Sequence, residues 1–113
     1  MILMISSYGD TLESKPNPRF GRASTFILYN LDEDSWKALD NPAVTATGGA
    51  GVAASQFLVD HGAQVAISGR FGPNAHQALK AAGIKMLTFD DAQSTVGTVV
   101  DAYKINQLST EQV

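Results

Sequence analysis

The pattern of apolar runs changes near residue 41, and this change constrains the fold more than any other feature of the sequence. Before it, three runs of β-forming residues at 1–7, 25–31 and 35–39 follow one another without a helical pattern between them. The turn at residues 32–34 is too short for a parallel crossover, so the second and third strands should be antiparallel. After it, helical and strand patterns alternate.

The second half of the chain shows three helical stripes separated by two short strands. Pro73 stands where a first helical residue is expected, and Gly62 and Gly83 should end the first two helices. Ser94 or Thr95 can cap the last helix. The expected elements are helices at 49–61, 73–82 and 96–103 and strands at 65–68 and 84–89.

This order, β-β-β-α-β-α-β-α, predicts an α/β fold. Alternating strands and helices imply parallel strands with right-handed crossovers, so we expect a mixed five-stranded sheet with helices on both faces. The chain of 113 residues suits a single core, and no linker divides it. We assign residues 1–106 to one domain and the polar residues 107–113 to a flexible C-terminal tail.

Composition excludes several kinds of site and partner. The chain has no cysteine, which excludes thiolate catalysis and every cysteine-ligated metal. A metal must then be held by other side chains or arrive inside a preformed cofactor. The net charge of −3 argues against a nucleic-acid partner. No apolar run approaches the roughly 20 residues that span a bilayer, and the N-terminus lacks a signal peptide, so we expect a cytoplasmic protein without a membrane partner.

The three arginines of the chain all lie beside a glycine in a predicted loop. They are Arg19, Arg22 and Arg70. Two glycine-rich loops, at residues 48–51 and 69–72, lead into predicted helices that carry no acidic residue in their first turn. Helix N-termini present unpaired N–H groups and partial positive charge, and glycine lets a ligand approach the backbone. The pattern indicates an anion site.

Structural roles for the same residues stay open, because glycines cap helices and surface arginines are common. The letters Gly49-x-Gly51-x-x-Ala54 match a dinucleotide fingerprint, but the required preceding strand and following acid are missing, so we reject it. His76 lies off the apolar stripe of its helix and should be exposed, either as an ordinary surface residue or as a metal ligand. No catalytic set is recognisable, and we expect no enzyme.

Four segments together resemble the dinitrogenase iron–molybdenum cofactor biosynthesis family, over about residues 1–105 in order and spacing. They are Asn-Pro-Arg-Phe-Gly-Arg-Ala at 17–23, Gly-Gly-Ala-Gly at 48–51, Gly-Pro-Asn-Ala at 72–75 and Leu-Lys-Ala-Ala-Gly-Ile-Lys at 79–85. Members of that family include accessory proteins that carry the nitrogenase cofactor or its precursor, and an orange protein that holds a molybdenum–copper sulfide cluster. The resemblance implies a ribonuclease H-like fold.

The resemblance also implies a non-enzymatic carrier or store for an anionic metal–sulfur cluster of the Fe–Mo–S or Mo–Cu–S type, which the purified protein can lack. Cofactor-assembly or cluster-acceptor proteins are the implied partners. Many cofactor carriers have a histidine where this chain has Arg19, which points here to charge pairing with the cluster. The expected cofactor-binding residues are Arg19, Phe20, Gly21, Arg22, Gly48, Gly49, Gly51, Arg70 and Asn74, with His76 as a candidate metal ligand.

The sequence suggests two other functions. The chain could be a protein-interaction or regulatory module in which the cluster site is vestigial. Metal-dependent phosphate chemistry, which the fold name suggests, is discounted because the first strand, residues 2–7, contains no carboxylate.

Overall fold

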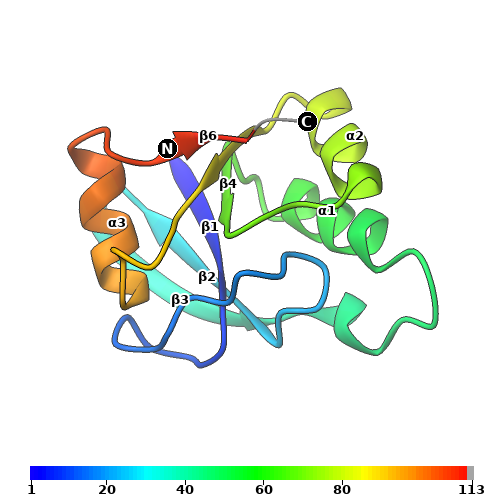
Figure 1. Ribbon diagram of the computed structural model, residues 1–113, viewed down its shortest axis with the longest axis horizontal. Coiled ribbons are helices and arrows are strands. Elements are labelled where there is room, and N and C mark those ends of the chain that lie inside the picture. Colours follow the sequence, from blue (N-terminus) through cyan, green and yellow to red (C-terminus); the bar gives the residue numbers. More distant parts are fainter. Residues whose placement is uncertain (112–113) are drawn as a thin grey trace.

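The computed structural model describes residues 1–111, which form one mixed sheet with helices on both of its faces (Figure 1). The strand order across the sheet is β3-β2-β1-β4-β5-β6. None of the described helices is long and apolar enough to cross a membrane. The elements are β1 (Ile2–Ser7), β2 (Thr25–Asn30), β3 (Ser35–Asp40), the 3-10 helix η1 (Pro42–Thr45), α1 (Ala50–Asp60), β4 (Val65–Ser68), α2 (Pro73–Ala81), β5 (Lys85–Thr88), α3 (Val96–Lys104) and β6 (Ser109–Thr110).

The strand pairing divides the sheet into an antiparallel and a parallel half, as the sequence predicts. β1, β2 and β3 pair antiparallel in sequence order, and the register sets Ile2 opposite Asn30 and Ser7 opposite Thr25. β1 then pairs parallel with β4, and β4 pairs parallel with β5. The carboxyl ends of β1, β4 and β5 therefore lie along the same edge of the sheet. The ribonuclease H-like classification stays a prediction.

β6 is a sixth strand, where the sequence analysis expected five. Ser109 and Thr110 pair antiparallel with Thr88 and Leu87 at the end of the sheet. Two exposed polar residues carry no alternating pattern, so periodicity could not reveal this strand. Part of the segment that was expected to be a flexible tail, residues 107–113, thus belongs to the sheet. Residues 112–113 of that segment lie outside the described residues.

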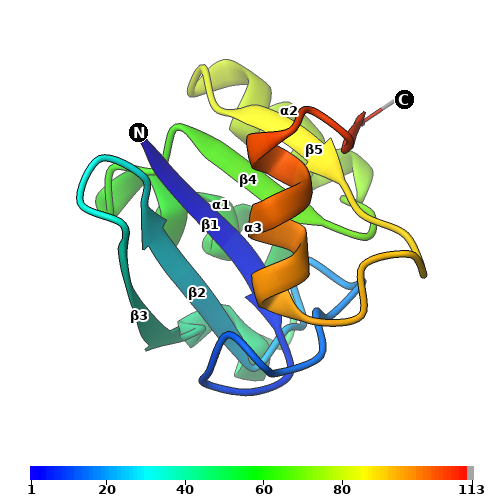
Figure 2. The same ribbon diagram turned by 90° about the vertical axis from the view of Figure 1, so that its left-hand side faces the viewer.

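Two apolar layers hold the helices to the sheet, because side chains alternate between its faces. Met4 and Phe26 point toward α1 and α2, which cover one face. Leu3, Ile5 and Ile67 point toward α3, which lies alone on the other face (Figure 2). All five side chains are buried. Burying a large apolar side chain is worth about 1.5–3 kcal/mol, so both layers stabilise the fold that positions the loops.

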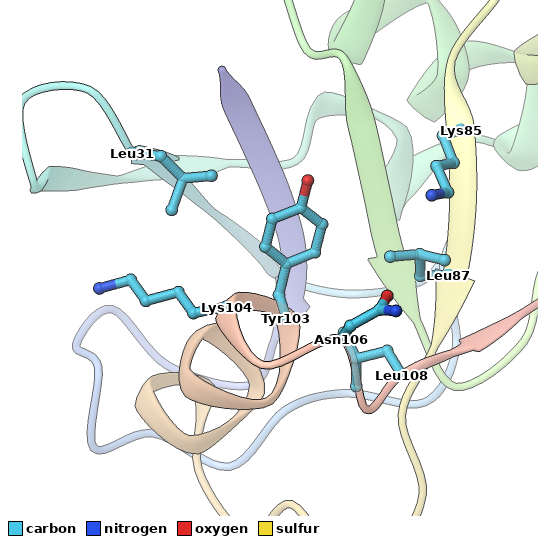
Figure 3. A pocket seen from close by; sticks show the side chains of 7 residues that line it. All are labelled: Leu31, Lys85, Leu87, Tyr103, Lys104, Asn106 and Leu108. Atoms are coloured by element: carbon cyan, nitrogen blue, oxygen red, sulfur yellow. The ribbon is translucent and has the colours of Figure 1, made fainter.

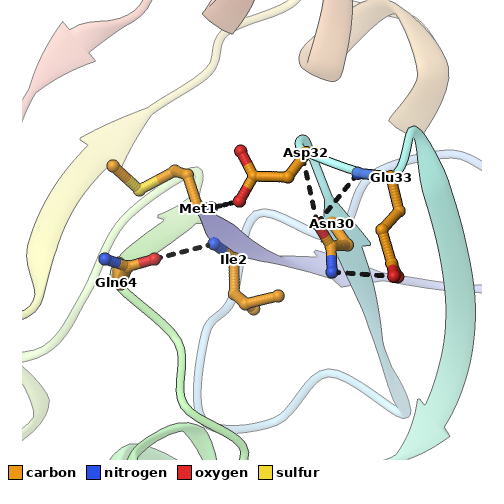
Figure 4. A network of polar contacts seen from close by, with 6 residues as sticks. All are labelled: Met1, Ile2, Asn30, Asp32, Glu33 and Gln64. Carbon is orange, nitrogen blue, oxygen red and sulfur yellow. Dashed lines mark hydrogen bonds and ion pairs between the residues drawn. The ribbon is translucent and has the colours of Figure 1, made fainter.

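Polar contacts join the start of β1 to its two neighbours (Figure 4). The Met1 ammonium group lies 2.7 Å from Asp32 Oδ2 in the turn between β2 and β3. The N–H of Ile2 donates to Gln64 Oε1, just before β4, over 3.1 Å. Asn30 Oδ1 accepts from the N–H of Asp32 and of Glu33, which closes the turn. These contacts are exposed, so they add little stability and mainly fix the local geometry.

Candidate functional site

Two loops that are far apart in sequence meet at the carboxyl ends of β1 and β4. The N–H of Arg70 donates to the Pro18 carbonyl over 2.9 Å, and Arg19 and Arg70 form an isolated parallel bridge. A Cβ at Gly69 would lie 2.6 Å from Pro18 Cα, closer than real Cβ atoms approach. Gly69 is therefore needed for this approach. The sequence Arg-Phe-Gly occurs twice, at residues 19–21 and 70–72, and the structure brings these two segments side by side.

The phenylalanines of these segments anchor the loops in the core. Phe20 and Phe71 are only 2% and 4% exposed, and their ring centroids are 5.0 Å apart. Phe20 also lies 5.3 Å from the ring of Phe26 in β2. Aromatic pairs at such distances stabilise beyond the area that they bury. Because the phenylalanines point inward, the arginines before them, Arg19 and Arg70, are left exposed at the surface.

A pair of buried serines supports the first loop from below. Ser6 in β1 and Ser68 in β4 are fully buried, and their hydroxyl oxygens are 2.8 Å apart. The Ser6 hydroxyl donates to the Asn17 carbonyl over 2.6 Å, and the Ser68 hydroxyl lies 3.4 Å from the Pro18 carbonyl. Asn17 Oδ1 in turn accepts from the N–H of Arg19 over 3.0 Å. This network fixes the backbone that carries Arg19.

Seven of the predicted cofactor-binding residues line one pocket of about 270 Å³. Both α1 and α2 begin at it, with Gly49 and Gly72 as their N-caps. Neither cap makes a side-chain hydrogen bond, and neither first turn holds an acidic residue, as predicted. Helix N-termini of this kind attract anions. The predicted residues that line the pocket are Arg19, Phe20, Gly21, Arg22, Gly51, Arg70 and Asn74, and they are joined by Ala50, Gly72, Pro73 and Ala75.

Two of the lining glycines serve close packing. A Cβ at Gly51 would lie 3.2 Å from Ala75 Cβ, so Gly51 lets the first turns of α1 and α2 touch. A Cβ at Gly21 would lie 3.1 Å from the backbone nitrogen of Gly51. These distances are shorter than ordinary van der Waals contacts. Close packing of the loops therefore explains why both positions are glycine.

Gly72 differs, because neither its backbone nor its neighbours require a glycine. Its φ is −76°, which any residue can adopt, and a Cβ there would meet no atom within 4 Å among the described residues. Gly72 nevertheless lines the pocket at the N-terminus of α2. A glycine in that place leaves the helix N-terminus open to a ligand. Sequence reasoning included this loop but not this residue.

The three arginines make different contacts. The Arg22 guanidinium donates to the carbonyls of Ala46 over 2.8 Å and Val44 over 3.3 Å, and so ties down the chain before α1. The side chains of Arg19 and Arg70 make no hydrogen bond or ion pair with residues 1–111. No acidic residue is among those that line the pocket. Arg19 and Arg70 therefore carry guanidinium groups that have no ion-pair partner in the described part of the chain.

Three predicted site residues lie outside this pocket. Gly48 and Gly49 are exposed and do not line it, and Gly49 adopts a φ of 69°, which explains its identity as a helix cap. His76 lines a different groove, between α2 and β5. The expectation that His76 is exposed is wrong, since it is half-buried and its Nδ1 is buried without a hydrogen-bond partner in residues 1–111. Its role as a metal ligand stays a prediction.

The described residues contain no cluster of three or more His, Cys, Asp or Glu side chains that could hold a bare metal ion.

The acidic side chain of Glu111 approaches the second glycine loop, residues 69–72. Glu111 Oε2 accepts from the N–H of Phe71 over 2.9 Å, and the N–H of Glu111 donates to the Met86 carbonyl over 3.1 Å. Sequence reasoning missed Glu111, because 40 residues separate it from Phe71 and it follows a polar segment without periodicity.

Comparisons with known proteins agree with this arrangement. The sequence pattern of the family described as dinitrogenase iron–molybdenum cofactor matches residues 1–106. The chain is 34% identical to the orange protein from Desulfovibrio gigas, and matches its apo structure with a TM-score of 0.90 over 96% of this chain and 91% of that one. It is 33% identical to a NifB-like protein of the DUF35 family from Thermotoga, with a TM-score of 0.84 over 96% and 91% of the two chains. A comparison with curated proteins found no match. On its sequence and its structure, the chain belongs to the dinitrogenase iron–molybdenum cofactor family.

Proposed function

We propose that this protein binds and carries a small anionic metal–sulfur cluster in the pocket between Arg19 and Arg70. The observation that carries the proposal is the pair of guanidinium groups without a partner among residues 1–111, placed beside two helix N-termini. This positive pocket belongs to a protein whose net charge is −3. Anions are favoured where arginine donors and unpaired backbone N–H groups converge.

The side chains present suit a cluster that brings its own ligands. The chain has no cysteine, so thiolate cannot bind the metal, whereas sulfide inside a preformed cluster can. Arginine and backbone N–H groups would then hydrogen-bond the sulfide edge of the cluster. The pocket of about 270 Å³ is at the small end of ligand sites, which favours a compact inorganic anion over a dinucleotide.

The relatives guide the choice of cluster. The family description refers to the iron–molybdenum cofactor, and one solved relative is an orange protein. We infer a cargo of the Fe–Mo–S or Mo–Cu–S type, held by charge and hydrogen bonds without catalysis. Such binding is reversible, so the protein would receive the cluster from an assembly protein and release it to an acceptor in the cytoplasm.

Reconstitution tests this proposal. The purified protein is mixed with tetrathiomolybdate plus copper(I) or, separately, with isolated iron–molybdenum cofactor, and is then desalted. We expect coloured protein with molybdenum in a fixed ratio to the chain. A Lys80→Gln variant, changed at an exposed position outside the pocket, should load equally. Retention of neither metal source by the folded protein would overturn the proposal.

An interaction module with a vestigial site is the second candidate. It is favoured by the finding that Gly21, Gly51 and Gly69 are all explained by close packing, without any ligand. In that case the metal-free protein should capture a defined partner from an extract of its own host, and substitution of Arg19 and Arg70 should leave that capture unchanged.

A further inference from the structure

A second pocket, of about 350 Å³, lies at the opposite edge of the sheet from the arginines (Figure 3). Lys85 is the first residue of β5, and Leu31 directly follows β2, which runs antiparallel to β1. Both therefore lie at the amino ends of the parallel strands, on the face that α3 covers. The lining residues are Leu31, Lys85, Leu87, Tyr103, Lys104, Asn106 and Leu108.

The floor of this pocket is apolar. Leu87 is 6% exposed, and Leu31 and Leu108 are half-buried against the same core layer. The half-buried ring of Tyr103 completes the surface between them, and Figure 3 shows its hydroxyl extending away from α3. Such an apolar floor suits the apolar body of an organic ligand. A simple inorganic ion would make no use of it.

The polar groups around the floor favour an anion. The Lys85 ammonium group, the Tyr103 hydroxyl and the Asn106 amide make no hydrogen bond with the described residues. All three can donate hydrogen bonds. No acidic side chain lines this pocket, and its charged lining residues, Lys85 and Lys104, are both cations.

Of the two lysines, Lys85 is the one available to a ligand. Lys104 Nζ lies 3.4 Å from Asp34 Oδ1, and Asp34 also accepts a hydrogen bond from the Tyr29 hydroxyl. That hydrogen bond and the charge of Lys104 hold the pKa of the Asp34 carboxyl below its ordinary value, so the carboxylate stays charged beside Lys104. Figure 3 shows Lys104 extending away from the other lining side chains, whereas the amino group of Lys85 lies on the side of Leu87.

The C-terminus of α3 borders this pocket, and several of its last carbonyls are paired by the turn that follows the helix. The carbonyls of Asp101, Ala102 and Tyr103 accept from the N–H groups of Ile105, Gln107 and Asn106 over 3.3, 2.9 and 3.0 Å. Asn106 adopts a φ of 60° to make this turn. Because these terminal carbonyls are paired within the chain, they do not present free acceptors to the pocket.

We propose that this pocket binds a small organic carboxylate with an apolar body, such as an arylalkanoate. The carboxylate would pair with Lys85 and accept from Tyr103 and Asn106, while the apolar body lies on Leu31, Leu87 and Leu108. The site uses no residue of the arginine pocket and does not depend on cluster binding.

The test uses 4-phenylbutyrate as the probe and the unmodified full chain. In an NMR titration we expect saturable amide shifts at residues 31, 85–87 and 103–108. The neutral isostere 4-phenylbutanol, and acetate, which lacks the apolar body, should each bind at least about tenfold more weakly. Lys85→Gln should weaken 4-phenylbutyrate about tenfold, and Tyr103→Phe by about threefold to tenfold. Lys80→Gln, changed on α2 outside the pocket, should bind as the unchanged protein does.

Lys85 is exposed, so its substitution should not affect folding, and the amide spectrum of each variant shows this directly. Equal binding of 4-phenylbutyrate by Lys85→Gln would overturn the proposal. So would shifts confined to the arginine pocket, or shifts that do not saturate while the spectrum stays that of the folded protein.

Discussion

The two edges of the sheet carry positive charge in different ways. At the carboxyl ends of β1 and β4, Arg19 and Arg70 accompany glycine loops and two helix N-termini, and the pocket between them is small. At the amino ends, Lys85 lies beside leucines and a tyrosine ring. The first edge gathers several guanidinium and backbone N–H donors, whereas the second offers one free ammonium group beside leucines and a tyrosine ring.

This difference separates the ligands that each edge can bind. Planar guanidinium groups and backbone N–H groups suit the several acceptor atoms of a compact inorganic anion. A single ammonium group above leucines suits one carboxylate on an apolar body. The contrast also shows that positive charge alone does not define a site. Arg22 lines the same pocket as Arg19, but its guanidinium group donates to the Val44 and Ala46 carbonyls.

The largest expected effect is a loss of cluster affinity on substitution at the arginine edge, with no loss on substitution at the lysine edge. Replacing Arg19 and Arg70 together by alanine removes charge-assisted hydrogen bonds worth about 1.5–3 kcal/mol each, a tenfold to hundredfold loss of cluster affinity per residue. Cluster retention on a desalting column measures the loss. Lys85→Gln is the matched control and should retain the cluster fully.

Cluster retention on the desalting column also shows whether arginine or histidine holds the cluster. His76→Ala should have little effect, because His76 lines another groove. Full retention in the double arginine variant, with loss in His76→Ala, would show that a histidine ligand holds the metal.

A smaller effect concerns the buried serine network, Ser6 and Ser68, that fixes the backbone of the loop carrying Arg19. Ser6→Ala would leave the buried Asn17 carbonyl without its donor, which costs about 1–3 kcal/mol in the free energy of unfolding. Urea denaturation measures this cost. Ser68→Ala should act on the same network, so the double variant should lose less than the sum of the two single losses. Additive losses would contradict a shared network.

Gly72→Ala tests whether a glycine that the fold does not require serves the ligand. The added Cβ would meet no atom within 4 Å, and the φ of Gly72 suits alanine. The free energy of unfolding should therefore stay within about 1 kcal/mol of that of the unchanged protein. Cluster affinity should nevertheless fall, by about threefold to tenfold. Gly48→Ala is the matched control, because a Cβ there also meets open space but lies outside the pocket. Equal affinities for both variants would remove Gly72 from the site.

The smallest expected effect comes from Glu111. Its carboxylate accepts from Phe71, in the loop between Arg70 and Gly72, and so places a negative charge near the arginine pocket. Glu111→Gln keeps an acceptor but removes the charge, and anion affinity should rise about twofold to threefold at low salt. The gain should shrink as salt screens the interaction. An unchanged affinity at low salt would show that Glu111 is too distant to matter.

Much of the fold could be predicted because its strands and helices carry strong periodicity. The hairpin of β2 and β3, the parallel strands and the helix starting at Pro73 all follow from local patterns. β6 could not be predicted, because two exposed polar residues pair with β5 through their backbone alone. Arginine beside glycine before a helix is also visible in the sequence, and the anion site that it predicts in these loops stays a prediction.

What sequence could not supply was the contacts between distant segments. The Arg19–Arg70 bridge, the Ser6–Ser68 pair and the bond from Phe71 to Glu111 each join residues at least 40 positions apart. Without them Arg22 could not be told from Arg19, and Gly72 could not be told from Gly51. The difference between the structural and the exposed members of the site is set by packing, which one sequence does not record.

X-ray absorption at the molybdenum and copper edges of protein loaded with tetrathiomolybdate and copper tests the central claim most directly. If arginine and backbone groups hold a cluster that keeps its own sulfide, both metals should show sulfur ligands alone. The spectra of His76→Ala should then be the same as those of the unchanged protein. A nitrogen ligand on copper that disappears in His76→Ala would contradict the account, because the metal would then be held by an imidazole and not by the charge of Arg19 and Arg70.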